Sequence, residues 1–264
     1  MQPTLEQVIT WITEGAQIAL NMQNDKLEKH YKAPNELVTA ADSAVEAYLL
    51  EKIQGHFPDH SINSEESGDH VGDIDHKWHI DPIDGTLNYS HGIPIWGVSV
   101  GYAYKGELQI GVICNPAAGE TFWAARGQGA FLNGERINVS SVKIFSDSLL
   151  ITGFRQSLID TPRSNLHNFV QFSREVQTVR RLGAACLDLA YVACGRAEGF
   201  WEIGLNPWDV AAGILIIREA GGIVDSLYGD SELLAGKVDI LAANPYAFPQ
   251  MRRVLLEERE KILQ

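Results

Sequence analysis

Cysteine is scarce in this chain of 264 residues, which contains only Cys114, Cys186 and Cys194. The number is odd, and no Cys-x-x-Cys pair occurs. A disulfide framework and a thiolate zinc site are therefore both disfavoured, and a reducing compartment is expected.

Long apolar runs and a basic leader segment are also missing. No apolar stretch reaches the roughly 18 residues that indicate a membrane-spanning helix. Residues 1–6 contain neither the positively charged segment nor the apolar segment of a secretory signal. We therefore expect a protein of the cytoplasm that does not bind membranes.

Positive charge is low, because 21 lysines and arginines oppose 34 acidic residues and give a formal net charge of −13. Nucleic acids and anionic membranes repel such a chain, so general binding to either is disfavoured. A phosphate ester can still bind where a metal ion reverses the local field.

Hydrophobic periodicity predicts an α/β chain with two halves, 1–146 and 147–264, that form one compact unit. In the first half, helical patterns at 4–28 and 42–55 precede an antiparallel meander between 96 and 137. Segments 32–36 and 69–75 are predicted to be loops. In the second half the predicted strands are 149–153, 175–182, 197–203, 223–225 and 240–243, and the predicted helices are 165–174, 184–194, 209–220 and 246–263.

One stretch of the first half combines a strand, a turn and a helix start. An apolar run ends at Asp81, and Pro82 is expected to stop the ladder hydrogen bonds because it has no N–H. Asp84 follows, and Gly85 and Thr86 suit a tight turn and a helix N-terminus. Such a turn aims two carboxylates and several N–H groups at one point, so it predicts a site for a cation and a phosphate.

Other carboxylates stand beside turn or helix-start signals, namely Glu65, Glu66 and Asp209. Taken singly, the glutamates are explained by a solvated loop and Asp209 by a helix N-cap. If they converge with Asp81 and Asp84, each pair about 4 Å apart repels by roughly 4 kcal/mol at an effective dielectric constant near 20. A cation would relieve this repulsion, and oxygen ligands favour Mg²⁺, Mn²⁺ or Ca²⁺ over zinc. The implied chemistry is phosphoryl transfer to a metal-activated water.

Three motifs together resemble those of the inositol monophosphatase family. They are Glu65-Glu66-Ser67, Asp81-Pro82-Ile83-Asp84-Gly85-Thr86-Leu87-Asn88 and Trp208-Asp209-Val210-Ala211-Ala212-Gly213. Segments 183–193 and 199–204 are similar to the bacterial branch, and the resemblance extends over nearly the whole chain. It implies a layered αβαβα sugar-phosphatase sandwich with a largely antiparallel N-terminal sheet and a smaller C-terminal sheet.

The resemblance also implies two or three Mg²⁺ ions per active site, with Mn²⁺ as an alternative. Glu65, Asp81 and the Ile83 carbonyl would hold the first ion. Asp81, Asp84 and Asp209 would hold the second, and a third, weaker ion would lie beside Glu65. Inhibition by Li⁺ and a homodimer are typical of the family.

The resemblance further assigns roles around the attacking water and the substrate. Glu65 and Thr86 would orient the water, and Asp42 would support Thr86. Asp42 also forms a capping-box pattern with Thr39, which alone explains a carboxylate at that position. The substrate-binding residues that the resemblance implies are Asp84, Gly85, Thr86, Gly183, Ala184, Ala185, Glu202 and Lys32.

Two positions depart from the family pattern. Ala184 stands where relatives often have Ser or Thr, so a hydroxyl that faces the substrate is missing. Asn63-Ser64 replaces the small residue and the Gly or Thr that usually precede the acidic pair.

The leading hypothesis is Mg²⁺-dependent hydrolysis of a small phosphate monoester, foremost inositol monophosphate, by in-line displacement. The same reaction on fructose bisphosphate, NADP, another sugar phosphate or a 3′-phosphoadenosine nucleotide is an alternative, although Glu202 favours a small polyol. A non-catalytic role beside RNA polymerase or in RNA processing, as in some relatives, is the second alternative. The expected partners are a small phosphorylated polyol or sugar and a second copy of the chain.

Overall fold

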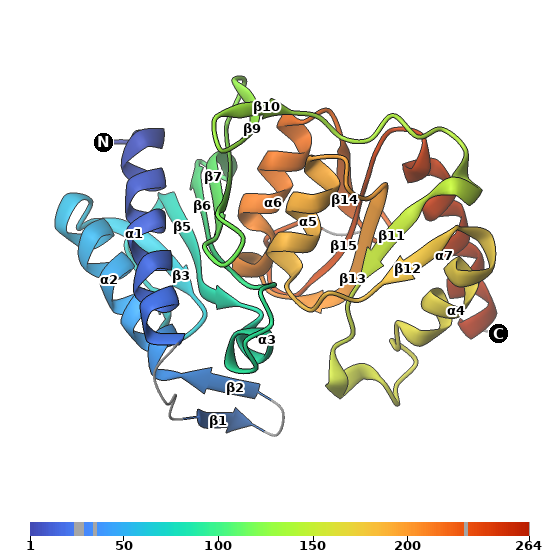
Figure 1. The fold of residues 1–264 in the computed structure, drawn as a ribbon, viewed down its shortest axis with the longest axis horizontal. Coiled ribbons are helices and arrows are strands. Elements are labelled where there is room, and N and C mark those ends of the chain that lie inside the picture. The colour runs from blue at the N-terminus through green and yellow to red at the C-terminus, as the bar shows by residue number, and fades with distance from the viewer. Residues whose placement is uncertain (24–28, 34–35, 230–231, 264) are drawn as a thin grey trace.

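The computed structural model describes residues 1–23, 29–33, 36–229 and 232–263, with side chains described in all of these except 29–33, 36–37 and 261–263. The described chain forms five layers, in which three layers of helices alternate with two β-sheets (Figure 1). The predicted αβαβα sandwich is therefore confirmed. Among the helices described, none combines the length and the apolar character needed to cross a lipid bilayer.

The first layer contains α1 (Leu5–Gln23) and α2 (Ala40–His56). α1 turns an apolar face inward, with Ile12 fully buried, as its periodicity predicts. α2 begins with the capping box predicted for Thr39 and Asp42, in which the two residues satisfy each other's backbone N–H groups.

The second layer is an eight-stranded sheet in the order β10-β9-β8-β7-β6-β5-β3-β4. All its pairs are antiparallel except β3–β5, and β6 to β10 form the meander predicted between 96 and 137. The Asn133-Gly134 turn joins the last two strands with positive φ at both residues. The strands are β3 (His60–Ser64), β4 (Gly68–His70), β5 (Asp73–Asp84), β6 (Gly97–Tyr104), β7 (Glu107–Asn115), β8 (Glu120–Ala125), β9 (Gly129–Leu132) and β10 (Glu135–Ile137).

The third layer contains α5 (Ala185–Ala193) and α6 (Pro207–Glu219). α6 lies close against β6 and β7 because these strands present glycine to it. A Cβ on Gly101 would lie 2.6 Å from the Cβ of Ala211. A Cβ on Gly111 would lie 2.7 Å from the carbonyl oxygen of Ala212. The approach of the two halves therefore depends on glycine at these positions.

We expect Gly101→Ala to lower the free energy of unfolding by roughly 1–3 kcal/mol, the usual cost of overpacking a filled contact. Gly55→Ala is a suitable control, because no atom lies within 4 Å of a Cβ at that helical position. It should be neutral or stabilise the protein by up to about 1 kcal/mol, since alanine favours helix over glycine. Urea unfolding measures both, and wild-type stability in Gly101→Ala would contradict the packing argument.

The fourth layer is a five-stranded mixed sheet in the order β12-β11-β13-β15-β14. β11 pairs in parallel with β12 and β13, whereas β15 pairs antiparallel with β13 and β14. Its strands are β11 (Leu149–Thr152), β12 (Thr178–Arg180), β13 (Gly199–Leu205), β14 (Ile223–Ser226) and β15 (Val238–Ala243). The fifth layer contains α4 (Leu166–Glu175) and α7 (Ala247–Leu263), on the outer face of this sheet (Figure 1).

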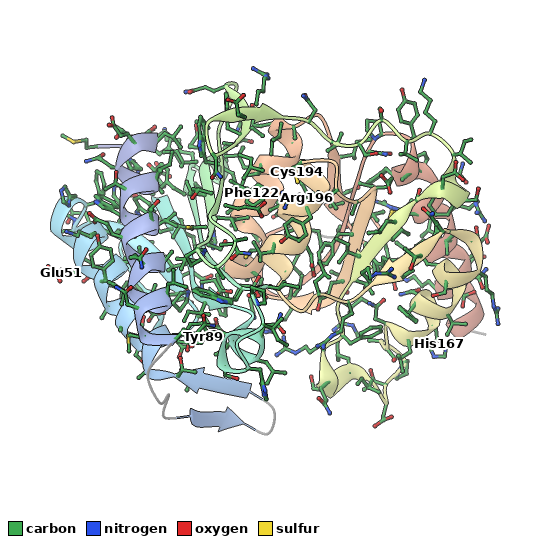
Figure 2. The ribbon with its side chains drawn as sticks, in the orientation of Figure 1. Glu51, Tyr89, Phe122, His167, Cys194 and Arg196 are labelled. Carbon is green, nitrogen blue, oxygen red and sulfur yellow. The ribbon has the colours of Figure 1, made fainter. Side chains whose placement is uncertain are left out.

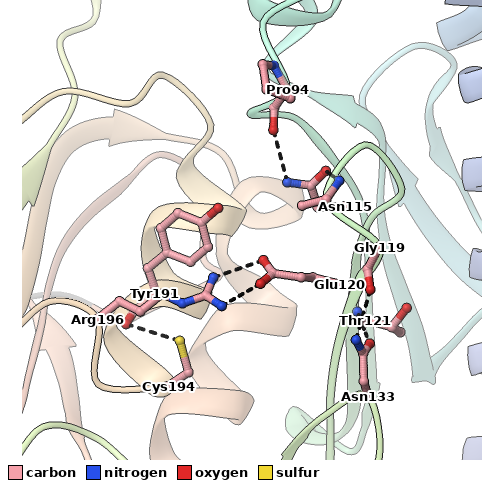
Figure 3. A network of polar contacts seen from close by, with 10 residues as sticks. Pro94, Asn115, Gly119, Glu120, Thr121, Asn133, Tyr191, Cys194 and Arg196 are labelled. Atoms are coloured by element: carbon pink, nitrogen blue, oxygen red, sulfur yellow. Dashed lines mark hydrogen bonds and ion pairs between the residues drawn. The ribbon is translucent and has the colours of Figure 1, made fainter.

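An ion pair also joins the two halves (Figure 3). Arg196, which follows α5, donates two hydrogen bonds to the carboxylate of Glu120 on β8. Its guanidinium lies 4.9 Å from the ring centre of Tyr191 and 6.0 Å from that of Phe122. The hydrogen bonds that Arg196 donates to Glu120 raise the pKa of Arg196 above its ordinary value. The two sheets are connected by the segment between β10 and β11, which contains the predicted boundary at residue 146.

Both predicted loops of the first half are wrong in part. Residues 32–33 end β1 (Lys29–Ala33) and residue 36 begins β2 (Glu36–Thr39), which form a separate antiparallel pair, while residues 34–35 lie outside the described residues. Segment 69–75 contains most of β4 and the start of β5. The residues of β4 and of the start of β5 lie at the surface, so they lack the apolar alternation by which a half-buried strand is recognised.

Candidate active site

The segment from Asp81 to Asp84 continues β5, so the prediction that Pro82 stops the ladder is wrong. β5 pairs with β6 at Asp81 opposite Ser99 and again at Asp84 opposite Gly97. The extra residue between these pairs forms a bulge, which accommodates a proline that cannot donate to the ladder. Both carboxylates line the same pocket.

A sharp turn follows at Gly85, whose φ of 87° lies in the left-handed region that glycine tolerates best. A Cβ there would lie 3.0 Å from the Cβ of Ala184, so glycine also lets the second half approach. The short helix α3 (Thr86–Ser90) begins next. Tyr89, labelled in Figure 2, is fully buried and donates a hydrogen bond to the Ala19 carbonyl, which fixes α3 against α1.

Asp42 lies behind Thr86 and is fully buried. One of its carboxylate oxygens accepts hydrogen bonds from the N–H and the hydroxyl of Thr39. The other lies 3.2 Å from the hydroxyl oxygen of Thr86, which in turn lies 2.9 Å from the Ile83 carbonyl oxygen. Burial raises the pKa of Asp42 above its ordinary value, against the opposing effect of these hydrogen bonds. Asp42 is thus both a helix cap and a neighbour of Thr86, while its catalytic role stays a prediction.

Glu65 lies in the turn between β3 and β4. Its N–H donates a hydrogen bond of 3.2 Å to the Ile80 carbonyl, which places Glu65 beside Asp81. The carboxylate of Glu65 is close enough to that of Asp81 to raise the pKa of Asp81.

Asp209 is the third residue of α6, so its interpretation as an N-cap is corrected. The N-cap is Asn206, and Pro207 occupies the first helical position. One oxygen of Asp209 accepts a hydrogen bond of 2.7 Å from the N–H of Asn206 and completes a capping box. The helix start therefore fixes the orientation of the Asp209 carboxylate.

These residues surround one pocket of about 210 Å³, to which both halves of the chain contribute. Asp42 lies outside the lining, behind Thr86. The predicted residues that line the pocket are Glu65, Asp81, Ile83, Asp84, Gly85, Thr86, Gly183, Ala184, Ala185, Glu202 and Asp209. The candidate residues therefore converge in space, whereas their individual roles stay predictions.

Burial and mutual repulsion raise the pKa values of the acidic side chains in this pocket. Burial, followed by the charges of Glu65, Asp84 and Asp209, raises the pKa of Asp81 well above its ordinary value. Burial and the charge of Asp84 raise the pKa of Asp209 to about 7. Burial and the charges of Asp209 and Asp84 raise the pKa of Glu202 to about 8. The pocket thus holds more negative charge than its own groups neutralise.

The donors of this pocket fit a hard cation. Oδ1 of Asp81 is buried without a hydrogen-bond partner, which is costly for a carboxylate oxygen. The donor groups are carboxylates and a carbonyl, the ligands that suit Mg²⁺. Within the described part of the chain, no three His, Cys, Asp or Glu side chains already form a metal-ligand group.

The start of α5 holds Asp84 in place. One Asp84 oxygen accepts a hydrogen bond from the N–H of Cys186, and the N–H groups of Ala185 and Gly85 also favour its ionised form. Sequence analysis considered Cys186 only in the count of cysteines and missed this contact. The sequence signal for this contact was the start of an apolar helix just after Gly183. The first backbone N–H groups of a helix have no partner within the helix, so they need acceptors such as Asp84.

Sequence analysis missed five lining residues, which are Gly153, Phe154, Arg181, Leu205 and Asn206. Gly153 follows β11, and a Cβ there would overlap the carboxylate of Glu202. Arg181 brings a positive charge that opposes the rise in the pKa of Glu202. Gly153 directly follows a buried strand, and this position was a sequence signal that it could line a site. Arg181 is exposed and follows another arginine, so the sequence offered no signal for it.

Lys32 and Ala184 are two of the substrate residues that the family resemblance implies. The backbone of Lys32 belongs to β1, but its side chain lies outside the described residues, so its role stays untested. Ala184 precedes α5 and is almost fully buried, and it offers no hydroxyl to the pocket.

Comparisons with known proteins agree with this fold. The sequence model described as "Inositol monophosphatase family" matches residues 1–264. The Nus factor SuhB of Salmonella typhimurium (strain LT2) is 41% identical over 247 residues, which cover 92% of each chain. The inositol-1-monophosphatase of Synechocystis sp. is 45% identical over 222 residues, which cover 83% of this chain and 77% of the relative.

A solved structure extends the likeness to three dimensions. The crystal structure of the extragenic suppressor protein suhB from Bartonella henselae gives a TM-score of 0.89 at 34% identity, covering 95% of this chain and 97% of that chain. The chain therefore belongs to the inositol monophosphatase family.

Proposed function

We propose that this protein is a Mg²⁺-dependent phosphomonoesterase whose foremost substrate is inositol monophosphate. The observation that supports the proposal best is the convergence of Glu65, Asp81, Asp84 and Asp209 on one small pocket, with a buried oxygen of Asp81 left without a partner. A carboxylate cluster of this kind supports a cation site better than a binding surface for a macromolecule.

The proposed ions are held by the residues that the family resemblance implies. Glu65, Asp81 and the Ile83 carbonyl would hold the first Mg²⁺, and Asp81, Asp84 and Asp209 would hold the second. A third, weaker ion and replacement by Mn²⁺ belong to the same proposal. When bound, Mg²⁺ lowers the pKa of a water and stabilises charge on the attacking and leaving oxygens.

The protein's own groups then orient the reactants. Glu65 and the Thr86 hydroxyl orient the attacking water, and Asp42 keeps the Thr86 hydroxyl in position through the contact of 3.2 Å. The N–H groups of Gly85 and Thr86 receive the phosphate, because the positive φ of Gly85 brings the backbone close to the pocket.

The leaving alcohol is placed against the second half of the chain. Glu202 lies on β13 and lines the pocket, so its carboxyl group can form a hydrogen bond with a substrate hydroxyl. Gly153 leaves the space that the Glu202 carboxyl group occupies. A pocket of about 210 Å³ suits a small polyol phosphate better than a dinucleotide such as NADP.

Two alternatives follow from the relatives. Several similar proteins are named Nus factor SuhB, so a role in transcription that does not need catalysis is the second candidate. The complete carboxylate set favours retained catalysis, since charges that repel one another are costly where no cation uses them. A homodimer in the cytoplasm and inhibition by Li⁺ complete the proposal.

Phosphate release from a panel of esters tests the substrate. With saturating Mg²⁺, we expect the kcat/KM for inositol 1-phosphate to exceed those for fructose 1,6-bisphosphate, NADP and 3′-phosphoadenosine 5′-phosphate at least tenfold. Faster hydrolysis of another panel member would overturn the choice of substrate. No hydrolysis of any ester by protein that binds Mg²⁺ would favour the non-catalytic role.

A further inference from the structure

Helix α2 contains a second buried acidic residue that the proposed mechanism does not use. Glu46 follows Asp42 by four residues, so the two side chains lie on the same face of the helix. Asp42 is 0% exposed and Glu46 is 3% exposed. Glu51, farther along α2, points away from the sheets in Figure 2. Burial of a glutamate is costly unless its oxygens are hydrogen-bonded, so the partners of Glu46 explain why it is inside.

Those partners all belong to the segment that contains Glu65. Glu46 accepts hydrogen bonds from the hydroxyl of Ser64, from the N–H of Glu66 at 3.0 Å and from the N–H of Ser67 at 2.7 Å. The donors are the residue before Glu65 and the two residues after it. Together with the bond from the Glu65 N–H to the Ile80 carbonyl, these contacts hold the turn on two sides.

We propose that Glu46 is a positioning residue that fixes Glu65, and thereby the first metal site and the attacking water, against Thr86. The inference rests on the proposed function, because Glu65 and Thr86 are assigned there to the attacking water. Asp42 contacts Thr86, and Glu46 contacts the turn of Glu65, one helical turn away. Since an α-helix rises about 6 Å over four residues and is stiff, α2 sets the separation of these two catalytic groups.

The chemistry of the contact requires a carboxylate. Three donors point at Glu46, and both of its oxygens accept. A glutamine has the same shape but only one oxygen, and its NH₂ group is a donor. In Glu46→Gln, the new NH₂ group would therefore face at least one of the donors of Ser64, Glu66 and Ser67. Two donors repel each other, so the turn that contains Glu65 would move.

Glu46→Gln with a matched control tests the proposal. The control is Glu198→Gln, because Glu198 is 6% exposed and accepts a hydrogen bond of 2.7 Å from the Leu149 N–H. It lies outside the pocket lining. Both variants lose one buried acceptor, so both should unfold at a somewhat lower temperature.

The readout that separates the variants is Mg²⁺ binding, measured by calorimetry on metal-free protein. In Glu46→Gln we expect the Kd of the tighter site to rise roughly 10–100-fold, the usual effect of losing a residue that holds a metal ligand. We also expect kcat to fall at least about tenfold with KM changed less than about threefold, because Glu46 does not line the pocket. Glu198→Gln should bind Mg²⁺ as the wild type does.

Ser64→Ala keeps the proposal testable if Glu46→Gln does not fold. It removes only the hydroxyl donor, so the Mg²⁺ Kd should rise about threefold, as expected for one modest hydrogen bond. An unchanged Kd in folded Glu46→Gln, or in Ser64→Ala where Glu46→Gln is unfolded, would overturn the positioning role alone. A wild type that binds no Mg²⁺ would overturn the proposed function itself.

Discussion

Asp84→Asn is expected to lose phosphatase activity at least about a thousandfold, a rise of roughly 4 kcal/mol in the activation free energy. The Asp84 side chain lines the pocket with Asp81 and Asp209, and it accepts a hydrogen bond from the N–H of Cys186. Asparagine removes the negative charge that the second ion requires, while its carbonyl oxygen still accepts from Cys186.

The fold should survive this substitution, because it removes one of several charges that repel one another. Burial raises the pKa of Asp84, and its charge in turn raises the pKa values of Asp209 and Glu202. We therefore expect metal-free Asp84→Asn to unfold at the same temperature as the wild type or above it. Activity lost together with stability would instead indicate a damaged fold.

Asp239→Asn is a suitable control for Asp84→Asn. Asp239 is a partly buried aspartate that accepts a hydrogen bond of 2.9 Å from the N–H of Gly204, but it lies outside the pocket lining. The same substitution there removes one negative charge and one ion pair with Arg163. The kcat of Asp239→Asn should remain within about threefold of wild type, because Asp239 lies outside the pocket lining. Wild-type activity in Asp84→Asn would remove the basis for the metal site.

The local part of the site could be predicted from sequence because its signals are short. Asp81, Asp84 and Gly85 are close together in the chain, and the residue types indicate a turn with carboxylates. The family motifs then added Glu65 and Asp209, which lie far away in sequence but line the same pocket. The five layers followed from the resemblance, whereas periodicity predicted only the elements and the two halves.

The missed parts depend on backbone groups and on packing between distant elements. The N–H of Cys186 that holds Asp84 is present in every residue except proline, so the sequence does not mark it. The bulge at Pro82 depends on how β6 pairs with β5. Glu46 has the same residue type as the exposed Glu51, and only the partners from the turn of Glu65 distinguish it.

Metal-free protein is expected to lose stability as the pH rises from 7 to 8.5. Glu202 and Asp209 have pKa values of about 8 and about 7 in the folded protein, well above those of unfolded chains. Groups of this kind stabilise the fold while protonated, and that contribution is lost as the pH rises through the folded pKa. Titration of Glu202 and Asp209 over this range corresponds to about 1.5 kcal/mol.

The measurement is made above pH 7 because two buried histidines make the protein less stable as the pH falls, whereas the carboxyl groups make it less stable as the pH rises. Burial lowers the pKa of His79 to about 3 and also lowers that of His60. Both histidines take up protons on unfolding, so the fold loses stability below the ordinary histidine pKa of about 6.5. Above pH 7 these two contributions are nearly constant, and the pocket carboxyl groups dominate the change.

Mg²⁺ should reverse the loss of stability at high pH. A bound cation requires ionised ligands, so its affinity rises as the carboxyl groups lose their protons. At a hundredfold excess over Kd, each ion adds about 2.7 kcal/mol, so two ions exceed the stability lost by titration alone. Thermal unfolding in EDTA and in MgCl₂, at pH 7.0 and 8.5 and at equal ionic strength, measures both effects. A melting temperature in EDTA that is flat or rises with pH would contradict the carboxylate repulsion inferred for the pocket, and a melting temperature insensitive to Mg²⁺ would contradict the proposed ion sites.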